Sequence, residues 1–235
     1  MMRPVFVALD TANPTRLNQL VGQLGDPQEV YLKLGMEIFY GLGAEPVREL
    51  SQKGYKIFLD LKLHDIPNTV YNAAKQIAKL GIDYTTVHAL GGSKMIEAAK
   101  AGLIEGNPAG HNLPKLLAVT ELTSISDQVL AEEQNCRLPM KEQVVSLAKT
   151  AKAAGADGVI CSPLEVQALR AKVGEDFLYV TPGIRPKTSA SDDQSRIATP
   201  SQAKEFGSSA LVVGRPITLA SDPQAAYEAI KKEFN

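Results

Sequence analysis

Two aspartates and a lysine form the most chemically suggestive group in the chain, with the spacing Asp60-x-Lys62-x-x-Asp65. Asp60 and Lys62 are two residues apart, so on a β-strand both side chains point to the same face. An ammonium flanked by carboxylates keeps its charge, and it could stabilise a developing anion and then donate a proton. The alternative is an ordinary ion pair at a strand end. A second carboxylate exceeds what charge neutralisation needs, which favours catalysis.

The apolar run that leads into this group predicts the strand that positions it. Residues 56–62 have a strand pattern in which Phe58 shares the face of Asp60 and Lys62. The other face is apolar and carries Ile57, Leu59, Leu61 and Leu63. A parallel strand covered by helices has this arrangement, with apolar side chains outward and layered side chains inward. We therefore expect Asp60 and Lys62 on an inner face, near the carboxyl end of the strand.

The same kind of strand recurs along the chain and alternates with helical periodicity. Strand patterns occupy residues 5–10, 30–34, 56–62, 83–88, 113–120, 158–161, 177–181 and 210–213. Helical patterns follow at 14–24, 45–53, 68–80, 98–104, twice before 154, at 164–173 and at 223–234. Alternating strands and helices indicate a parallel sheet with right-handed crossovers. Eight strands at this length favour a closed (β/α)8 TIM barrel over an open doubly wound sheet, as a single domain spanning residues 1–235.

Polar side chains cluster where such a barrel places its active site. The residues at or near predicted strand ends are Asp10, Lys33, Asp60, Lys62, His88 and Thr120. Catalytic residues of these barrels come from the carboxyl ends of several strands. A single charged residue at a strand end is commonly just solvated. Charges of both signs from three consecutive strands indicate a common site instead.

Two loops late in the chain have the composition of a phosphate site. Residues 181–186 and 213–217 each contain a Gly and an Arg, and they follow the seventh and eighth predicted strands. Glycine lets backbone N–H groups approach an anion, and arginine adds a planar charged fork. These loops are the recurrent phosphate site of TIM barrels. The polar stretch 187–196 between them is either an ordinary surface loop or a lid over the phosphate, and Arg185 and Gln194 favour the lid.

Composition excludes several other classes of protein. The net charge of −1 and the absence of a basic run argue against nucleic acid as a partner. Cys136 and Cys161 lack metal-ligand spacing, and the three histidines have no metal-ligand company, so we expect no metal site. No apolar run approaches the roughly 20 residues needed to span a membrane, and no signal peptide is visible. We expect a soluble, cytoplasmic protein.

Taken together, the motifs resemble a known family. They are Asp10, Lys33, Asp60-x-Lys62-x-x-Asp65-Ile66-Pro67-Asn68-Thr69, Pro182-Gly183-Ile184-Arg185 and Val213-Gly214-Arg215-Pro216-Ile217. In this order and over nearly the whole chain, they resemble the orotidine 5′-phosphate decarboxylase family. Asp-x-Lys-x-x-Asp alone also occurs in sugar-phosphate relatives. The extension through Thr69 and the two arginine loops are more specific.

The resemblance implies a cofactor-free and metal-free conversion of orotidine 5′-monophosphate to uridine 5′-monophosphate and carbon dioxide. Lys62 would give a proton to pyrimidine C6, Asp60 would lie by the departing carboxylate, and Lys33 would complete the charge chain. The family resemblance also implies a homodimer in which Asp65 enters the neighbouring subunit's site.

The resemblance also implies how the rest of the nucleotide is bound. The implied contacts are Asp10 and Lys33 with ribose hydroxyls, Ile66 and Thr69 beside Asp65, Thr123 with the base, Gln194 between base and phosphate, and Pro182, Arg185, Gly214 and Arg215 around the phosphate.

Two other functions stay open. One is a metal-dependent sugar-phosphate decarboxylase or aldolase, which would need Mg²⁺. The other is a non-catalytic barrel that binds a phosphate ligand.

Overall fold

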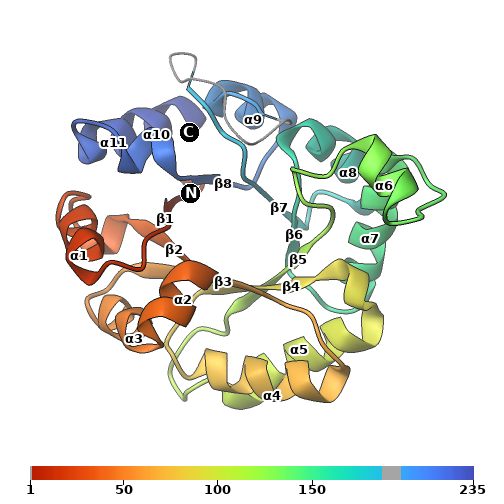
Figure 1. The fold of residues 1–235 in the computed structure, drawn as a ribbon, viewed down its shortest axis with the longest axis horizontal. Helices are drawn as coiled ribbons and strands as arrows, with labels where there is room; N and C mark the ends of the chain where they lie inside the picture. Colours follow the sequence, from red (N-terminus) through yellow and green to blue (C-terminus); the bar gives the residue numbers. More distant parts are fainter. Residues whose placement is uncertain (1, 187–196) are drawn as a thin grey trace.

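The computed structural model describes residues 2–186 and 197–235, and in this part of the chain eight parallel strands close into a barrel (Figure 1). The strands are β1 (Val5–Leu9), β2 (Tyr31–Gly35), β3 (Lys56–Leu63), β4 (Tyr84–His88), β5 (Lys115–Val119), β6 (Gly158–Ile160), β7 (Leu178–Thr181) and β8 (Ala210–Val213). Strands adjacent in sequence are adjacent in the ring, and β8 pairs with β1 to close it. The predicted (β/α)8 barrel is confirmed.

Most of the helices form an outer ring around the strands (Figure 1). They are α1 (Pro14–Gly22), α2 (Met36–Leu42), α3 (Glu45–Gln52), α4 (Pro67–Ala78), α5 (Ser93–Gly106), α6 (Asp127–Glu132), α7 (Met140–Ala153), α8 (Val166–Val173), α9 (Pro200–Phe206), α10 (Arg215–Thr218) and α11 (Pro223–Phe234). Over the described residues, none of these helices combines the length and apolarity needed to cross a bilayer. Two apolar shells lie between helices and strands, one on each side of the barrel.

The sequence patterns predict no helix at α2, α9 or α10, and these are the main departures from expectation. Each is short, with seven, seven and four residues, too few for a periodic apolar face. Local signals define their starts instead. Thr199 and Gln202 form a capping box at the start of α9, while Gly35 precedes α2 and Gly214 precedes α10 without a side-chain cap.

Aromatic rings fill the amino-terminal part of the barrel interior. The Phe6 ring contacts the rings of Tyr31, Phe58 and Tyr84 at centroid distances of 5.5, 5.2 and 5.1 Å. All four come from the first three residues of their strands. Edge-to-face contacts of this kind add to the free energy gained by burial. The interior is therefore closed at this end, which leaves its open space at the carboxyl ends of the strands.

Three strands, β3, β5 and β7, each donate a backbone hydrogen bond near their amino-terminal ends to a side chain just before the next strand. Asp83, just before β4, accepts a hydrogen bond from the backbone N–H of Ile57 in β3 at 2.9 Å. Asp157, just before β6, accepts one from Leu116 in β5 at 2.7 Å. Ser209, just before β8, accepts one from Tyr179 in β7 at 3.0 Å. In each case a side chain takes up a backbone donor near the strand start, which the barrel would otherwise leave unpaired.

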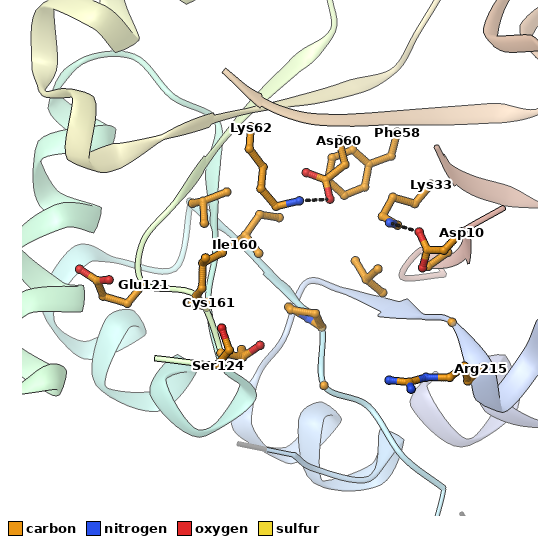
Figure 2. A pocket seen from close by; sticks show the side chains of 18 of the residues that line it. Asp10, Lys33, Phe58, Asp60, Lys62, Glu121, Ser124, Ile160, Cys161 and Arg215 are labelled. Carbon is orange, nitrogen blue, oxygen red and sulfur yellow. Dashed lines mark hydrogen bonds and ion pairs between the residues drawn. The ribbon is translucent and has the colours of Figure 1, made fainter. Parts of the chain in front are cut away.

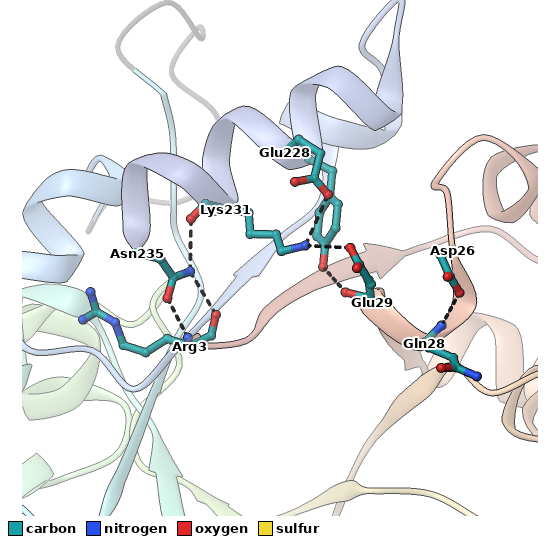
Figure 3. A network of polar contacts seen from close by, with 8 residues as sticks. Arg3, Asp26, Gln28, Glu29, Glu228, Lys231 and Asn235 are labelled. Atoms are coloured by element: carbon teal, nitrogen blue, oxygen red, sulfur yellow. Dashed lines mark hydrogen bonds and ion pairs between the residues drawn. The ribbon is translucent and has the colours of Figure 1, made fainter. Parts of the chain in front are cut away.

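The two ends of the described chain meet at Arg3 and Asn235, just before β1 begins (Figure 3). The Asn235 side chain accepts a hydrogen bond from the Arg3 backbone N–H at 2.6 Å and donates one to the Arg3 carbonyl at 3.2 Å. The Arg3 guanidinium donates to the Phe234 and Ser208 carbonyls and lies 4.1 Å from the centre of the Phe234 ring. Beside it, Lys231 forms ion pairs with Glu29 and Glu228. These contacts hold α11 against β1.

Candidate active site

A cavity of about 340 Å³ opens at the carboxyl ends of the strands. This volume falls within the usual range for small-molecule sites. Its lining comes from strand ends and following loops around the ring: Ala8, Asp10, Lys33, Phe58, Asp60, Lys62, Val119, Glu121, Leu122, Thr123, Ser124, Ile160, Cys161, Pro182, Gly183, Arg185, Val212, Gly214 and Arg215. Phe58, Asp60 and Lys62 all reach it, as the alternation of side chains along β3 predicts (Figure 2).

Lys62 and Asp60 form an ion pair on the wall of this cavity. Lys62 Nζ lies 2.8 Å from Asp60 Oδ2, and the side chains are 25% and 12% exposed (Figure 2). Partial burial strengthens such a pair relative to one in bulk water. Lys62 has a φ of 51°, in the left-handed region that non-glycine residues seldom adopt. The register of β3 against β4 also shifts between Leu59 and Leu63. The strand is thus locally distorted where it carries the lysine.

A second ion pair lies next to the first. Lys33 Nζ donates a hydrogen bond to Asp10 Oδ1 at 3.0 Å, and Lys33 is almost as buried as Asp60. Figure 2 shows the Lys33 amine turned toward Asp10, with Asp60 between Lys33 and Lys62 in that view. Gly35 leaves room for this contact, because a Cβ there would lie 3.2 Å from Lys33 Nζ. Two ammonium groups and two carboxylates therefore share one side of the cavity.

The part of the cavity wall formed by the loops after β7 and β8 carries two arginines. Arg185 and Arg215 both line the cavity, and Arg185 is buried. The Arg185 backbone N–H donates to the Ala198 carbonyl at 2.9 Å, and the Ala198 N–H donates to the Gly183 carbonyl at 3.1 Å. Gly183 has a φ of 77°, which only glycine adopts without strain. Pro182 and Gly214 also line the cavity. Gln194 and the predicted lid at 187–196 lie outside the described residues.

Three predicted site residues do not reach this cavity. Asp65, Ile66 and Thr69 follow β3 and are exposed, and none is part of the lining. The Asp65 carboxylate instead accepts a hydrogen bond from the backbone N–H of Ile66 at 2.6 Å. Ile66 has 66% of its surface exposed, which is high for a large apolar side chain.

Several cavity residues have no counterpart in the sequence-based site. Glu121 is 3% exposed, and Gln134 and Gln143 each donate a hydrogen bond to its carboxylate at 3.4 Å. Ser124 and Cys161 also line the cavity. The available signal was position: Glu121 and Cys161 come within two residues of the ends of β5 and β6. Neither belongs to a motif with recognisable spacing.

Two histidines lie near the Lys62–Asp60 pair, with their rings tilted against each other. The ring centres of His64 and His88 are 5.4 Å apart, and His88 Nδ1 is buried without a hydrogen-bond partner among the described residues. Burial, then the neighbouring His64 and Lys62, lower the pKa of His88 below its usual value, while Asp60 acts in the opposite direction. The described residues contain no group of three or more His, Cys, Asp or Glu side chains arranged around a metal-sized space.

Comparisons with known proteins agree with one another. The family model described as "Orotidine 5'-phosphate decarboxylase / HUMPS family" matches residues 3–230. Orotidine 5′-phosphate decarboxylase from Lactobacillus acidophilus is 72% identical over 235 residues, all of both chains. The enzyme of the same name from Lactiplantibacillus plantarum is 48% identical, again over all of both chains. A crystal structure of the L. acidophilus enzyme superposes with a TM-score of 0.92 and covers 99% of each chain at 69% identity.

Proposed function

The chain belongs to the orotidine 5′-phosphate decarboxylase / HUMPS family, and we propose that its cavity converts orotidine 5′-monophosphate to uridine 5′-monophosphate and carbon dioxide, with Lys62 as the proton donor. The two curated relatives described above match the chain over its full length and are decarboxylases of this name. The observation that supports the residue assignment is the 2.8 Å Lys62–Asp60 pair, placed across one cavity from Arg185 and Arg215.

The reaction needs a fixed cation beside C6 of the pyrimidine. Breaking the bond between C6 and the carboxylate releases carbon dioxide and leaves an electron pair in the ring plane, where the π system cannot delocalise it. The Lys62 ammonium stabilises that pair as it forms and then transfers a proton to C6. The neutral amine regains a proton from solvent. This interaction grows as charge develops on C6, so it lowers the barrier rather than merely tightening substrate binding.

Asp60 has a secondary energetic role. Two like charges about 4 Å apart interact by roughly 4 kcal/mol at an effective dielectric near 20, which bounds its repulsion of the substrate carboxylate. Enzymes lower barriers by about 8 to 23 kcal/mol, so repulsion alone does not reach the upper part of that range. The main contribution of Asp60 is to hold the Lys62 ammonium in place through their ion pair.

The rest of the cavity suits the rest of the nucleotide. Arg185 and Arg215 supply the charged forks for the phosphate, with Pro182 and Gly214 shaping the same loops. Asp10 and Lys33, paired at 3.0 Å, bind the ribose hydroxyls. Thr123 contacts the base. Gln194, outside the described residues, is proposed to bridge base and phosphate. Phosphate binding far from C6 would help assemble the charged site around the reacting atom.

The exposed residues after β3 fit a site that is completed by a second subunit. Asp65 does not reach the cavity of its own chain, and its neighbour Ile66 is an exposed apolar side chain. We propose a homodimer in which Asp65, Ile66 and Thr69 enter the partner's site. A second carboxylate would then flank Lys62 from the opposite subunit.

Decarboxylation is tested directly by ultraviolet absorbance. Purified protein mixed with orotidine 5′-monophosphate should destroy the orotate chromophore and yield uridine 5′-monophosphate, equally with and without EDTA. The family description also covers HUMPS proteins, and a metal-dependent sugar-phosphate enzyme is the competing function. Activity abolished by EDTA would support metal dependence. A folded protein with no turnover of this nucleotide would contradict the proposal.

The role of Lys62 is tested by Lys62→Ala. We expect kcat to fall by more than about 10³-fold, because a preorganised group that meets the developing charge is lost. Affinity for uridine 5′-monophosphate should stay close to wild type, since the arginine loops are intact. Lys56→Ala is the matched control: Lys56 lies on the same strand, in an ion pair with Asp83 at the far end of the barrel. Near-normal turnover of Lys62→Ala would rule out the proton-donor assignment.

A further inference from the structure

We propose that Thr86 is a positioning residue of this site, whose hydroxyl holds both the Lys62 backbone and the Asp60 carboxylate. Thr86 lies in the middle of β4, is fully buried and is absent from the cavity lining. It does not line the substrate space, and it belongs to none of the motifs found in the sequence. The inference rests on the function proposed above, because it assigns Thr86 to the support of Lys62 and Asp60.

The Thr86 hydroxyl joins the two residues in a closed arrangement. The Lys62 backbone N–H donates to Thr86 Oγ1 at 2.9 Å, and Thr86 Oγ1 donates to Asp60 Oδ1 at 2.8 Å. Asp60 Oδ2 in turn accepts from Lys62 Nζ at 2.8 Å. Each carboxylate oxygen therefore has its own donor. The carboxylate is fixed at two points, which sets both its position and its rotation.

Chemistry fixes the direction of these hydrogen bonds. A backbone N–H can only donate, so Thr86 must accept from Lys62 with a lone pair. A threonine hydroxyl has one proton, which is then free for Asp60. That proton goes to Asp60 Oδ1, which accepts it. Replacing Thr86 by a residue that can neither accept nor donate, such as valine, breaks two contacts of the site at once.

The distortion of β3 explains why a side chain is needed here. Lys62 has left-handed φ, and the pairing of β3 with β4 shifts between Leu59 and Leu63. Such an irregularity removes regular ladder hydrogen bonds while it re-aims a side chain. The Lys62 N–H finds the Thr86 hydroxyl in place of a β4 carbonyl. Thr86 thus stabilises the backbone conformation that points Lys62 into the cavity.

The adjacent Thr85 provides a matched control. It is also fully buried on β4, but its hydroxyl has no hydrogen-bond partner among the described residues. Side chains alternate along a strand, so Thr85 faces away from the barrel interior. Thr85→Val and Thr86→Val make the same chemical change one residue apart. Only the second removes contacts to Asp60 and Lys62.

The experiment measures kcat and the affinity for uridine 5′-monophosphate in Thr86→Val, Thr86→Ser and Thr85→Val. We expect kcat of Thr86→Val to fall at least tenfold, about 1.4 kcal/mol of transition-state stabilisation. Its affinity for the product should stay within about threefold, because the phosphate contacts are distant. Thr86→Ser keeps the hydroxyl and should restore most of kcat. Thr85→Val should match wild type in both quantities.

Other outcomes would overturn the proposal. One such outcome is that Thr86→Val has the same kcat as Thr85→Val. The other is that Thr86→Ser loses as much kcat as Thr86→Val. If Thr86→Val does not fold, Thr86→Cys carries the test, because a thiol donates and accepts only weakly. It should then be slower than Thr86→Ser. Lys62→Ala separates the two hypotheses: an inactive Lys62→Ala beside a fully active Thr86→Val would remove the role of Thr86 and leave the proposed function standing.

Discussion

Lys62 combines a strained backbone conformation with the position in the cavity for which we propose proton transfer. A left-handed φ costs a non-glycine residue roughly 1–2 kcal/mol, and such strain persists where its surroundings enforce it. The enforcing contacts come from Asp60 and Thr86. The alternation of side chains along β3 was sufficient to predict that Asp60 and Lys62 share a face. It could not reveal Thr86, because that contact joins residues 24 positions apart through a strand distortion with no sequence signature.

His88 gives a pH dependence at the residue scale. Burial and its neighbours His64 and Lys62 lower its pKa in the folded protein, so the unfolded chain binds a proton more readily. This contribution to stability is complete above the unfolded pKa of about 6.5 and is lost as the pH falls from there through the folded pKa. We expect the melting temperature to fall between about pH 7 and pH 5, and to fall less in His88→Asn.

The matched control for this prediction is His111→Asn. His111 is exposed in the loop after α5 and is not among the groups that act on His88. Its variant should keep the wild-type pH dependence of melting. Identical pH profiles for wild type and His88→Asn would show that His88 does not contribute.

At the scale of elements, the strands were predictable and the short helices were not. The strands are apolar runs on a repeating βα pattern, and β8 (Ala210–Val213) coincides with its sequence-based range. By contrast, α2 begins at the residue after β2, and α10 has only four residues. Packing against the rest of the barrel, rather than periodicity, determines such helices. The alternation of elements therefore predicted the barrel, while details of the loops that shape the cavity required the structure.

The side chain–backbone hydrogen bonds at the starts of the strands provide a stability prediction at this scale. Asp157→Ala leaves the Leu116 N–H without its acceptor and the Lys100 ammonium without its partner at 2.6 Å. Loss of a partner from a partly buried group costs about 1–3 kcal/mol, so the free energy of unfolding should fall by that amount in denaturant titrations. Glu175→Ala removes an exposed ion pair with Arg170 and should cost about 0–1 kcal/mol. Equal losses of unfolding free energy in the two variants would argue against a special role for the hydrogen bond between Asp157 and Leu116.

At the scale of the whole molecule, Lys62 lies in the cavity while Asp65 lies on the surface, and this difference leads to a test of the proposed homodimer. Lys62→Ala and Asp65→Ala are each expected to be inactive alone. If Asp65 acts in the partner's site, a hybrid dimer contains one site with both side chains intact. Random mixing should then restore about a quarter of wild-type activity, since half of the dimers are hybrids with one competent site each.

The control mixture combines Lys62→Ala with Asp60→Ala. Both residues line the cavity of the same chain, so every site in a hybrid dimer lacks one of them. That mixture should remain inactive. Demonstrated subunit exchange without recovery in the Lys62→Ala and Asp65→Ala mixture would contradict the shared site.

The contact between Arg3 and Asn235 holds the two ends of the described chain together, so the chain could begin and end elsewhere without changing the barrel. The side chain of Asn235 pairs with both backbone groups of Arg3, so the ends of the described chain lie side by side at the face away from the cavity (Figure 3). A short linker could join residues 235 and 2, and new termini could open in the exposed segment 109–113 between α5 and β5. Such a circular permutant would keep every strand neighbour and the whole cavity, and β8 would then be followed along the chain by α11 and β1.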